Sequence, residues 1–370
     1  MSTQSLTPNR TERVNRARGD LAMGIPCLLP DGSTWGVIAA LETVGEDRFY
    51  ALKGLLGTPK LVISPHRARA VMSNAAAADL GSEPVRILPP ESAEFSWYQH
   101  LIDPQIDHNS GVVGPLHVLR NGDTTLHETG LKLVKSAHLI PAFALFTIDG
   151  DDPLLNALNF VQLDAEESLA ELANELKLEP VAAAHLPLDA HTNSQLRVFR
   201  EPDGQREHYA LEIGSPSRAA PVLARLHSAC FTGDVLGSLK CDCGPQLRAA
   251  LAHMGEEGSG VLLYLNQEGR GIGLANKMRV YDLQSHGFDT VEANHQLGFD
   301  DDERDFRLAA TILKTLGFGS VRLLTNNPGK VERLESSGVT VVERLPLRVG
   351  QTAHNQNYLS TKALKSGHRL

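Results

Sequence analysis

Three of the four cysteines lie close together, with a spacing that suits a metal site. Cys230 and Cys241 are separated by ten residues, and Cys243 follows after one more. Three protein ligands leave the fourth tetrahedral position of zinc open for water, whose pKa zinc lowers to about 7. The spacing therefore favours a catalytic zinc site. Two alternatives are three buried structural thiols and a four-ligand structural site completed by His227 or Asp242.

Two other segments carry residue types that suit ligand binding, but each has an ordinary explanation. Gly269, Gly271 and Gly273 follow the spacing GxGxG, and not the GxGxxG spacing of a dinucleotide-binding turn, so we do not assign that function. The acidic run at residues 300–305 is typical of a solvated helix start, where carboxylates face the positive end of the helix dipole. Spacing alone assigns no chemistry to either segment.

The bulk composition predicts a globular chain with two domains. The 370 residues are 42% hydrophobic and 21% charged, which is enough for two cores. The net charge of −9 argues against a nucleic-acid-binding protein. The sequence has no run of about 18 apolar residues, so no membrane association is expected. Residues 1–20 lack the apolar middle of a secretion signal, and we expect a disordered tail on a cytoplasmic protein without a disulfide framework.

The elements that must position these residues follow an α/β pattern with mixed α+β sheets. Residues 21–188 form the first predicted domain, with strands at 35–40 and 60–63 and a helix at 166–176 that Asp164 caps. A polar segment at 187–194 is the expected linker. Residues 189–370 form the second domain. Its predicted elements are strands at 261–265, 321–325 and 339–342 and helices at 274–284, at 304–316 and from Pro328 onward.

Several runs of the second half resemble the GTP cyclohydrolase II family. One contains the sequence before and around Cys230, the next contains Cys241 and Cys243, and a third contains Glu-Gly-Arg at residues 268–270. They occur in the family's order over about half the chain. The matching runs are residues 224–234, 238–247, 266–274, 289–299, 324–328 and 357–362.

This resemblance implies a reaction and its cofactors. The family hydrolyses GTP, opens the imidazole ring of guanine and releases formate and pyrophosphate, which is the first step of riboflavin biosynthesis. The product is a diaminopyrimidinone ribosyl phosphate. One Zn²⁺ per subunit would be held by Cys230, Cys241 and Cys243, and Mg²⁺ would accompany the triphosphate. GTP is then the expected partner, and the resemblance also implies a homodimer.

The resemblance also implies roles for individual residues. Asp302 and Arg304 match the family's catalytic pair, in which the arginine either attacks the α-phosphate or stabilises its charge. Tyr281 matches a tyrosine whose phenol would act on the opening ring. The family usually has glutamate where this chain has Ala229, so we expect weaker binding or altered turnover. The residues implied to bind substrate are Arg225, Leu226, His227, Ser228, Gln246, Glu268, Gly269, Arg270, Thr290, Thr325 and Lys330.

The first half carries fainter similarities to a dihydroxybutanone phosphate synthase. Residues 136–141 resemble that enzyme's Pro-Gly-His segment, but its acidic magnesium-binding loop is absent. We therefore expect a degenerate, non-catalytic domain that serves folding, dimerisation or regulation, with His138 as a structural residue. An unrelated α/β domain is the alternative for this half. For the whole chain, the alternatives are a bifunctional enzyme that keeps the synthase activity and a non-catalytic GTP-binding regulator.

Overall fold

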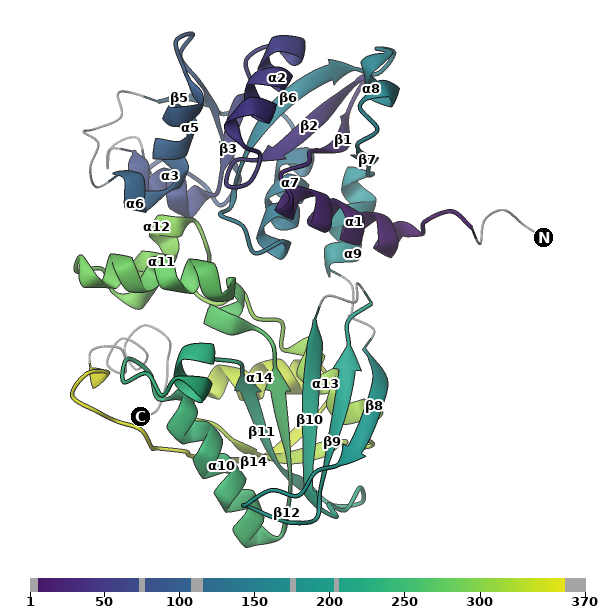
Figure 1. The fold of residues 1–370 in the computed structure, drawn as a ribbon, viewed down its shortest axis with the longest axis vertical. Helices are drawn as coiled ribbons and strands as arrows, with labels where there is room; N and C mark the ends of the chain where they lie inside the picture. Colours follow the sequence, from purple (N-terminus) through teal and green to yellow (C-terminus); the bar gives the residue numbers. More distant parts are fainter. Residues whose placement is uncertain (1–5, 73–76, 108–115, 174–177, 203–205, 357–370) are drawn as a thin grey trace. The chain divides into compact units, whose positions relative to one another are not determined.

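The chain folds into two compact units. The computed structural model describes residues 6–72, 77–107, 116–173, 178–202 and 206–356. The N-terminal unit comprises residues 1–174, 275–288 and 292–301, and the C-terminal unit comprises residues 175–274, 289–291 and 302–370 (Figure 1). Within the described ranges, no helix has both the length and the apolar character that crossing a membrane requires.

The core of the N-terminal unit is a mixed seven-stranded sheet. Its strand order is β5-β4-β3-β6-β2-β1-β7. Neighbouring strands are antiparallel except β1 and β7, which pair in parallel. The strands are β1 (Cys27–Asp31), β2 (Thr34–Ala40), β3 (Lys60–Ile63), β4 (Val85–Leu88), β5 (His117–Leu119), β6 (Ala142–Asp149) and β7 (Val161–Gln162).

Helices cover both faces of this sheet, because alternate strand residues are buried on opposite sides. Val37 packs in one apolar core with Phe49 and Tyr98, and its neighbour Ile38 packs in another with Leu21 and Val134. The first core takes side chains from α2 (Glu46–Leu56), α3 (Pro65–Val71) and α5 (Phe95–Ile102), and the second from α1 (Arg10–Ala22), α7 (Thr125–Ser136) and α9 (Ala165–Ala173). The N-terminal unit also contains two short helices, α6 (Pro104–Asp107) and α8 (Leu154–Ala157).

Helix α1 corrects the expectation of a disordered tail through residue 20. Asn9 and Glu12 form a capping box, in which each side chain accepts a hydrogen bond from the other residue's backbone N–H. Val14, Ala17 and Leu21 follow at helical spacing and are buried. The charged residues between them lie on the outer face of the helix. The segment is therefore polar in its average composition, although it forms a helix. Residues 1–5 lie outside the described residues.

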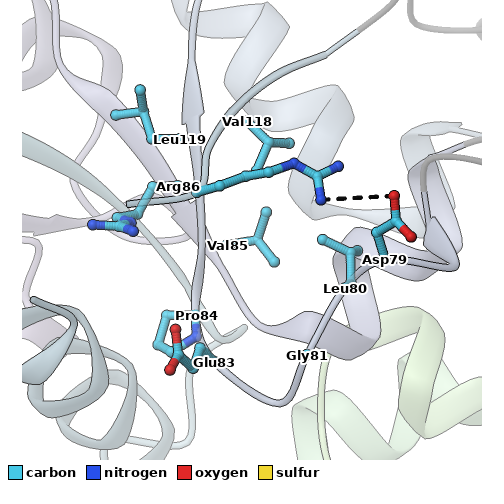
Figure 2. A pocket seen from close by; sticks show the side chains of 10 residues that line it. Asp79, Leu80, Gly81, Glu83, Pro84, Val85, Arg86, Val118 and Leu119 are labelled. Atoms are coloured by element: carbon cyan, nitrogen blue, oxygen red, sulfur yellow. Dashed lines mark ion pairs between the residues drawn. The ribbon is translucent and has the colours of Figure 1, made fainter. Parts of the chain in front are cut away.

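A surface pocket of the N-terminal unit lies at the edge formed by β4 and β5 (Figure 2). Val85 and Val118 line it together with the segment around Leu80. Arg120 forms a long ion pair with Asp79 at its rim, with 3.9 Å between nitrogen and oxygen. The pocket contains none of the site residues that the sequence predicts, so the expected chemistry lies elsewhere.

The C-terminal unit contains a second mixed sheet of seven strands. Its order is β14-β13-β11-β12-β10-β9-β8. The four strands from β14 to β12 are parallel to one another, and the remaining pairs are antiparallel. The strands are β8 (Glu179–His185), β9 (Ser194–Arg200), β10 (Glu207–Gly214), β11 (Val222–Ser228), β12 (Ser259–Leu265), β13 (Ser320–Leu324) and β14 (Thr340–Leu345).

Helices again cover both faces of the sheet. Met254 of α10 (Cys243–Glu257) packs with Ile213 on one face, and Leu313 of α13 (Arg307–Thr315) packs with Val261 on the other. Helix α14 (Pro328–Ser336) begins at its proline as predicted. The mixed α/β fold class is confirmed, and β2, β3, β12, β13, α13 and β14 lie within a few residues of their predicted positions.

The division between the units differs from the predicted boundary at residue 188 in two ways. The segment at 187–194, expected to be a linker, connects β8 to β9, which pair in one sheet. Most of helix α11 (Gly273–Ser285) and most of α12 (Thr290–Leu297) belong to the N-terminal unit, although they lie far along the sequence. Packing between distant segments decides both features.

Candidate metal and nucleotide site

Several of the predicted site residues lie where parallel strands of the second sheet end. β11, β12 and β13 run in the same direction, so their carboxyl ends lie at one edge. Ser228 ends β11, Glu268 follows β12, and Thr325 follows β13. Ligands bind in this position in open α/β sheets, because loops leaving adjacent strands meet there.

The three cysteine sulfurs are close enough to share one ion. All three Sγ atoms lie within 4.8 Å of one another, and those of Cys230 and Cys241 are 3.6 Å apart. Tetrahedral zinc with bonds of about 2.3 Å places two sulfurs about 3.8 Å apart. Cys243 is the first residue of α10, where the helix dipole favours a thiolate. The neighbouring Cys230 raises the pKa of Cys241, as expected of two thiols that need a cation between them to ionise together.

Two glycines create the space that the sulfurs occupy. Cys230 is followed by a π-helical turn, η2 (Phe231–Val235), that contains Gly233. A Cβ on Gly233 would lie 2.6 Å from the Sγ of Cys241 and 3.0 Å from that of Cys230. A Cβ on Gly244 would lie 2.2 Å from the carbonyl oxygen of Gly233. The turn and the start of α10 therefore approach each other more closely than any other residue type allows.

Neither alternative fourth ligand joins the thiol cluster. Among the described residues, the group that could hold a metal consists of the three cysteines alone. The Nε2 atom of His227 lies 3.0 Å from a carboxylate oxygen of Asp234, and Asp242 accepts a hydrogen bond from Gln246. The donor set thus fits a zinc ion with one open coordination position, which is the catalytic arrangement.

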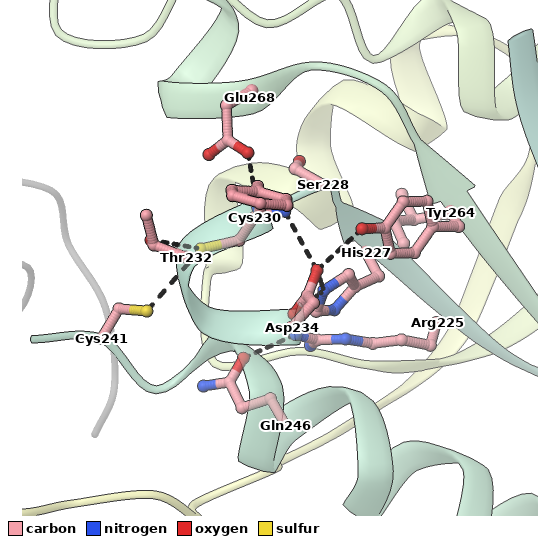
Figure 3. Close-up of polar contacts among 12 residues, drawn as sticks. Arg225, His227, Ser228, Cys230, Thr232, Asp234, Cys241, Gln246, Tyr264 and Glu268 are labelled. Carbon is pink, nitrogen blue, oxygen red and sulfur yellow. Dashed lines mark hydrogen bonds and ion pairs between the residues drawn. The ribbon is translucent and has the colours of Figure 1, made fainter. Parts of the chain in front are cut away.

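A buried hydrogen-bond network around Asp234 supports the first cysteine (Figure 3). One carboxylate oxygen of Asp234 accepts hydrogen bonds from the backbone N–H of Cys230 and from the hydroxyl of Tyr264, each at 3.0 Å. The His227 ring stacks on Tyr264, with centroids 5.4 Å apart. Burial lowers the pKa of His227 despite its Asp234 partner, and burial followed by the Asp234 charge raises the pKa of Tyr264. The shifted pKa values of His227 and Tyr264 therefore both favour the neutral form of the ring.

Arg225 and Gln246, which the resemblance implies as nucleotide contacts, are bonded to each other. The Arg225 guanidinium donates to the Gln246 side-chain oxygen at 2.6 Å and to the Leu324 carbonyl at 2.9 Å. Its Nε is buried and has no hydrogen-bond partner among the described residues. Burial lowers the pKa of Arg225 to about 10, and the Arg304 charge adds to this. A buried cation with a spare donor is well suited to a polar or anionic ligand group.

Asp302 and Arg304 form a bidentate ion pair. Two guanidinium nitrogens of Arg304 each donate to a different Asp302 oxygen at 2.7 Å, and a third donates to the Ser228 hydroxyl at 3.2 Å. Burial alone would raise the pKa of Asp302. The hydrogen bonds and charge of Arg304, together with the Arg333 charge, outweigh burial and hold that pKa below its usual value. Both side chains are therefore charged at neutral pH.

Three cations surround the ring of Phe306. The guanidinium carbons of Arg304 and Arg333 each lie 5.0 Å from the ring centroid, and the Lys330 Nζ lies 5.6 Å from it. Lys330 is buried and donates to the Leu226 carbonyl at 2.8 Å. Asp302 supplies one negative charge against three positive ones, so this group favours an anion such as a phosphate.

The Glu-Gly-Arg turn adopts an unusual backbone conformation. Gly269 and Arg270 both have left-handed dihedrals, with φ of 63° and 61°. Such a conformation is costly for arginine and persists where the surroundings fix it. Glu268 accepts the backbone N–H of Phe231 at 2.6 Å, and the carbonyl of Arg270 accepts the N–H of Glu303 at 3.0 Å. The turn thus links the segment after Cys230 to the segment that carries Arg304.

Of the remaining predicted residues, Thr325, Leu226 and Thr290 belong to the C-terminal unit, and Tyr281 belongs to the N-terminal unit. Thr325 is buried, and its hydroxyl accepts the Asn327 N–H at the start of α14. The Leu226 side chain lies in the apolar core, so only its backbone is available to a ligand. Tyr281 belongs to α11 in the N-terminal unit, where its ring lies 5.5 Å from the Lys277 Nζ. Thr290 is buried at the start of α12.

Sequence reasoning missed several residues that shape this site. Asp234 lies four residues after Cys230, and Tyr264 lies on the adjacent strand β12, but no motif distinguishes either residue. Gly233 could have been noted only as a glycine between two cysteines. Phe306 and Arg333 come together through the start of α13 and the exposed side of α14, which only the folded chain shows.

Comparison with known proteins identifies the family of this chain. The family model described as GTP cyclohydrolase II matches residues 179–346. A GTP cyclohydrolase-2 of Azospirillum brasilense is 39% identical over 363 residues, covering 96% of this chain and 93% of the relative. A GTP cyclohydrolase-2 of Citrobacter koseri is 57% identical over 196 residues, covering 53% of this chain and 99% of the relative.

This sheet edge combines a cysteine triad that could hold a metal ion with a carboxylate–arginine pair, and the comparisons define the class of the protein as a hydrolase. The chain belongs to the GTP cyclohydrolase II family. Among solved structures, a two-domain 3,4-dihydroxy-2-butanone 4-phosphate synthase from A. baumannii is 15% identical with a TM-score of 0.32, covering 90% of this chain and 99% of that one. Similarity at that level supports no argument about the N-terminal unit.

Proposed function

We propose that this chain hydrolyses GTP, opens the imidazole ring of guanine and releases formate and pyrophosphate. The observation that carries the proposal is the position of the three thiols in the same unit as the Asp302–Arg304 pair, with Ser228 connecting that pair to the strand before Cys230. A thiol cluster alone would suit a structural metal. The charged pair beside it indicates a reaction that also acts on a phosphate.

Cys230, Cys241 and Cys243 would hold the zinc, which when bound supplies Lewis-acid activation of water for attack on the guanine ring. Asp234 fixes the backbone of Cys230, and Gly233 keeps the sulfurs within reach of a common ion. The Asp234 carboxylate is already bonded to three neighbours within the protein. Its role is to orient the ligand loop.

Arg304, Lys330 and Arg225 would bind the phosphate tail, with Gln246, Glu268, Gly269, Arg270, Thr290 and Thr325 as further nucleotide contacts. Asp302 holds the Arg304 guanidinium charged and oriented through two hydrogen bonds. That arrangement supports electrostatic stabilisation of the departing pyrophosphate. Tyr281 would act on the opening ring. Mg²⁺ bound with the triphosphate, a homodimer and a cytoplasmic location complete the proposal.

Incubation of the purified chain with GTP, Zn²⁺ and Mg²⁺ tests the function. Formate and pyrophosphate should appear in equal amounts, and mass spectrometry should show a product that lacks the formyl carbon. GTP binding without turnover by folded, zinc-loaded protein would instead indicate the regulatory alternative. A parallel assay with ribulose 5-phosphate tests the bifunctional alternative, and we expect no product in it.

A further inference from the structure

The polypeptide passes from the N-terminal unit to the C-terminal unit immediately before the Asp302–Arg304 pair. Residues 292–301 fold with the N-terminal unit, whereas Asp302 begins the next stretch of the C-terminal unit. The peptide bond between Asp301 and Asp302 therefore joins a residue held by the N-terminal unit to a candidate catalytic residue. Whatever fixes Asp300 and Asp301 also limits where Asp302 and Arg304 can lie.

Two side chains from the first half of the sequence hold Asp300. His66 of α3 approaches one carboxylate oxygen at 3.1 Å, and Lys135 of α7 approaches the other at 3.0 Å. The hydrogen bond from His66 and then the Lys135 charge hold the pKa of Asp300 well below its usual range. Because each oxygen has its own partner on a different helix, the carboxylate is fixed in orientation as well as position.

Asp301 has its own contacts, which lie beside those of Asp300. His295 of α12 binds Asp301, with 2.7 Å between its Nε2 and a carboxylate oxygen. Its ring stacks on His66, with centroids 4.0 Å apart and planes 14° from parallel. The two imidazoles therefore connect the Asp300 and Asp301 pairs into one cluster, which consists of His66, Lys135, His295, Asp300 and Asp301.

Residues next to this cluster in the sequence are buried and closely packed. The Arg67 guanidinium is only 1% exposed and donates to three backbone carbonyls, including that of Gln296 at 3.1 Å in α12. Gly298 has φ of +90°, and a Cβ there would lie 2.7 Å from the Ser64 hydroxyl oxygen. This close approach of α12 to the start of α3 leaves little freedom to the residues that follow.

Helix α11 is attached to the same unit by separate contacts. Its buried Asn276 donates to the His138 carbonyl at 2.8 Å, and its Arg279 pairs with Glu42 at 2.9 Å. Gln105 donates to Asp282 at 3.0 Å. His138 has a left-handed backbone with φ of 59°, which presents its carbonyl to Asn276. The segment at 275–301 is thus bound to the N-terminal unit at both of its helices.

We propose that the N-terminal unit is a positioning domain for catalysis, in which His66 and Lys135 anchor Asp300 and thereby set the placement of the Asp302–Arg304 pair. The proposal rests on the proposed function, because it assigns Asp302 and Arg304 to the reaction. Exposed ion pairs of this kind add little to folding stability. Orientation of a reacting group is far more sensitive, since a displacement of about 1 Å can cost about a hundredfold in rate.

Lys135→Met and Asp300→Asn test the anchor, with Lys135→Arg as the conservative variant. Asp79→Asn is the matched control, because Asp79 is an exposed aspartate of the same unit that pairs with Arg120. For each protein, kcat and KM for GTP, zinc content and melting temperature are measured. Hydrogen–deuterium exchange of peptides covering residues 299–306 reports directly on the anchored segment.

We expect Lys135→Met and Asp300→Asn to lower kcat by about ten- to a hundredfold, with nearly unchanged KM, zinc content and melting temperature. The same variants should exchange faster in residues 299–306, whereas Lys135→Arg and Asp79→Asn should behave like the wild type. If residues 299–306 of Lys135→Met and Asp300→Asn exchanged hydrogen for deuterium at the wild-type rate, the proposal would be overturned. A loss of kcat that Asp79→Asn shares would also overturn it. If the wild type does not turn over GTP, the proposed function fails, and the exchange measurement alone decides the positioning role.

Discussion

Replacing Gly233 with alanine should impair zinc binding without unfolding the protein. The added Cβ would lie 2.6 Å from the Cys241 sulfur and 3.0 Å from the Cys230 sulfur. Nonbonded heavy atoms prefer separations of about 3.5–4.0 Å, so the Cys241 sulfur must move by about 0.9–1.4 Å and the Cys230 sulfur by about 0.5–1.0 Å. Zinc–thiolate geometry does not tolerate such a displacement easily, because bond lengths hold to within about 0.2 Å.

The size of the effect follows from the cost of overpacking. Inserting a methyl group into a closely packed site costs about 1–3 kcal/mol. If this strain falls on the metal-bound state, zinc affinity should weaken by about 5- to 150-fold, since 1.4 kcal/mol corresponds to a factor of ten. Competition with a chromophoric chelator measures the affinity, and elemental analysis gives the metal content.

Gly319→Ala is the matched control for this substitution. Gly319 lies in the same unit, a Cβ there would meet no atom within 4 Å, and its φ is outside the left-handed region. The control should bind zinc like the wild type and melt at a similar temperature. If Gly233→Ala also kept wild-type zinc affinity, the three sulfurs would not be held by this turn, and our view of the metal site would be wrong.

Three further predictions concern single side chains. Cys241→Ser should lose zinc and ring opening together, and retained turnover in zinc-free protein would contradict the assignment. Asp302→Asn should keep zinc but lower kcat by at least about a hundredfold. The folded pKa of Asp302 lies below its usual value, so its contribution to stability is present above about pH 4 and is lost as pH falls through the folded value. An acid titration of the stability of Asp302→Asn should not show this loss. Burial and then the Arg86 charge lower the pKa of His127 from 6.5 to about 4. The unfolded chain therefore binds a proton that the folded chain does not, and stability should fall by up to about 3 kcal/mol as pH drops from about 6.5 to about 4. Urea unfolding of His127→Gln at both ends of that range should show a smaller loss, and an equal loss would refute the effect.

Local features of the sequence were enough to predict many of the elements. β3 occupies the predicted residues 60–63, and α14 begins at Pro328. The predicted Asp164 cap of α9 is present, since its carboxylate accepts the Glu167 N–H at 2.7 Å. Caps, proline positions and apolar periodicity act over a few residues, so they can be recognised without knowledge of the rest of the fold.

The cluster of three thiols could also be predicted from the sequence, because zinc favours soft donors and three cysteines lie within a short segment. The residues that support the thiols could not be predicted in this way. Asp234, Tyr264 and Gly233 contribute through contacts that form only after β11, β12 and the start of α10 have packed. A carboxylate, a phenol and a glycine have no distinctive spacing, and their roles depend on which neighbours the sheet brings to them.

The sequence by itself determined the family of the chain and a cluster of three cysteines that could hold a metal ion, because residue types and motif order can be read directly from the sequence. Only the tertiary structure decided that α11 and the segment up to Asp301 fold with the N-terminal unit. The physical reason is that the partners of Asp300 are His66 and Lys135, more than 160 residues away along the chain. Periodicity and caps contain no information about contacts at that separation.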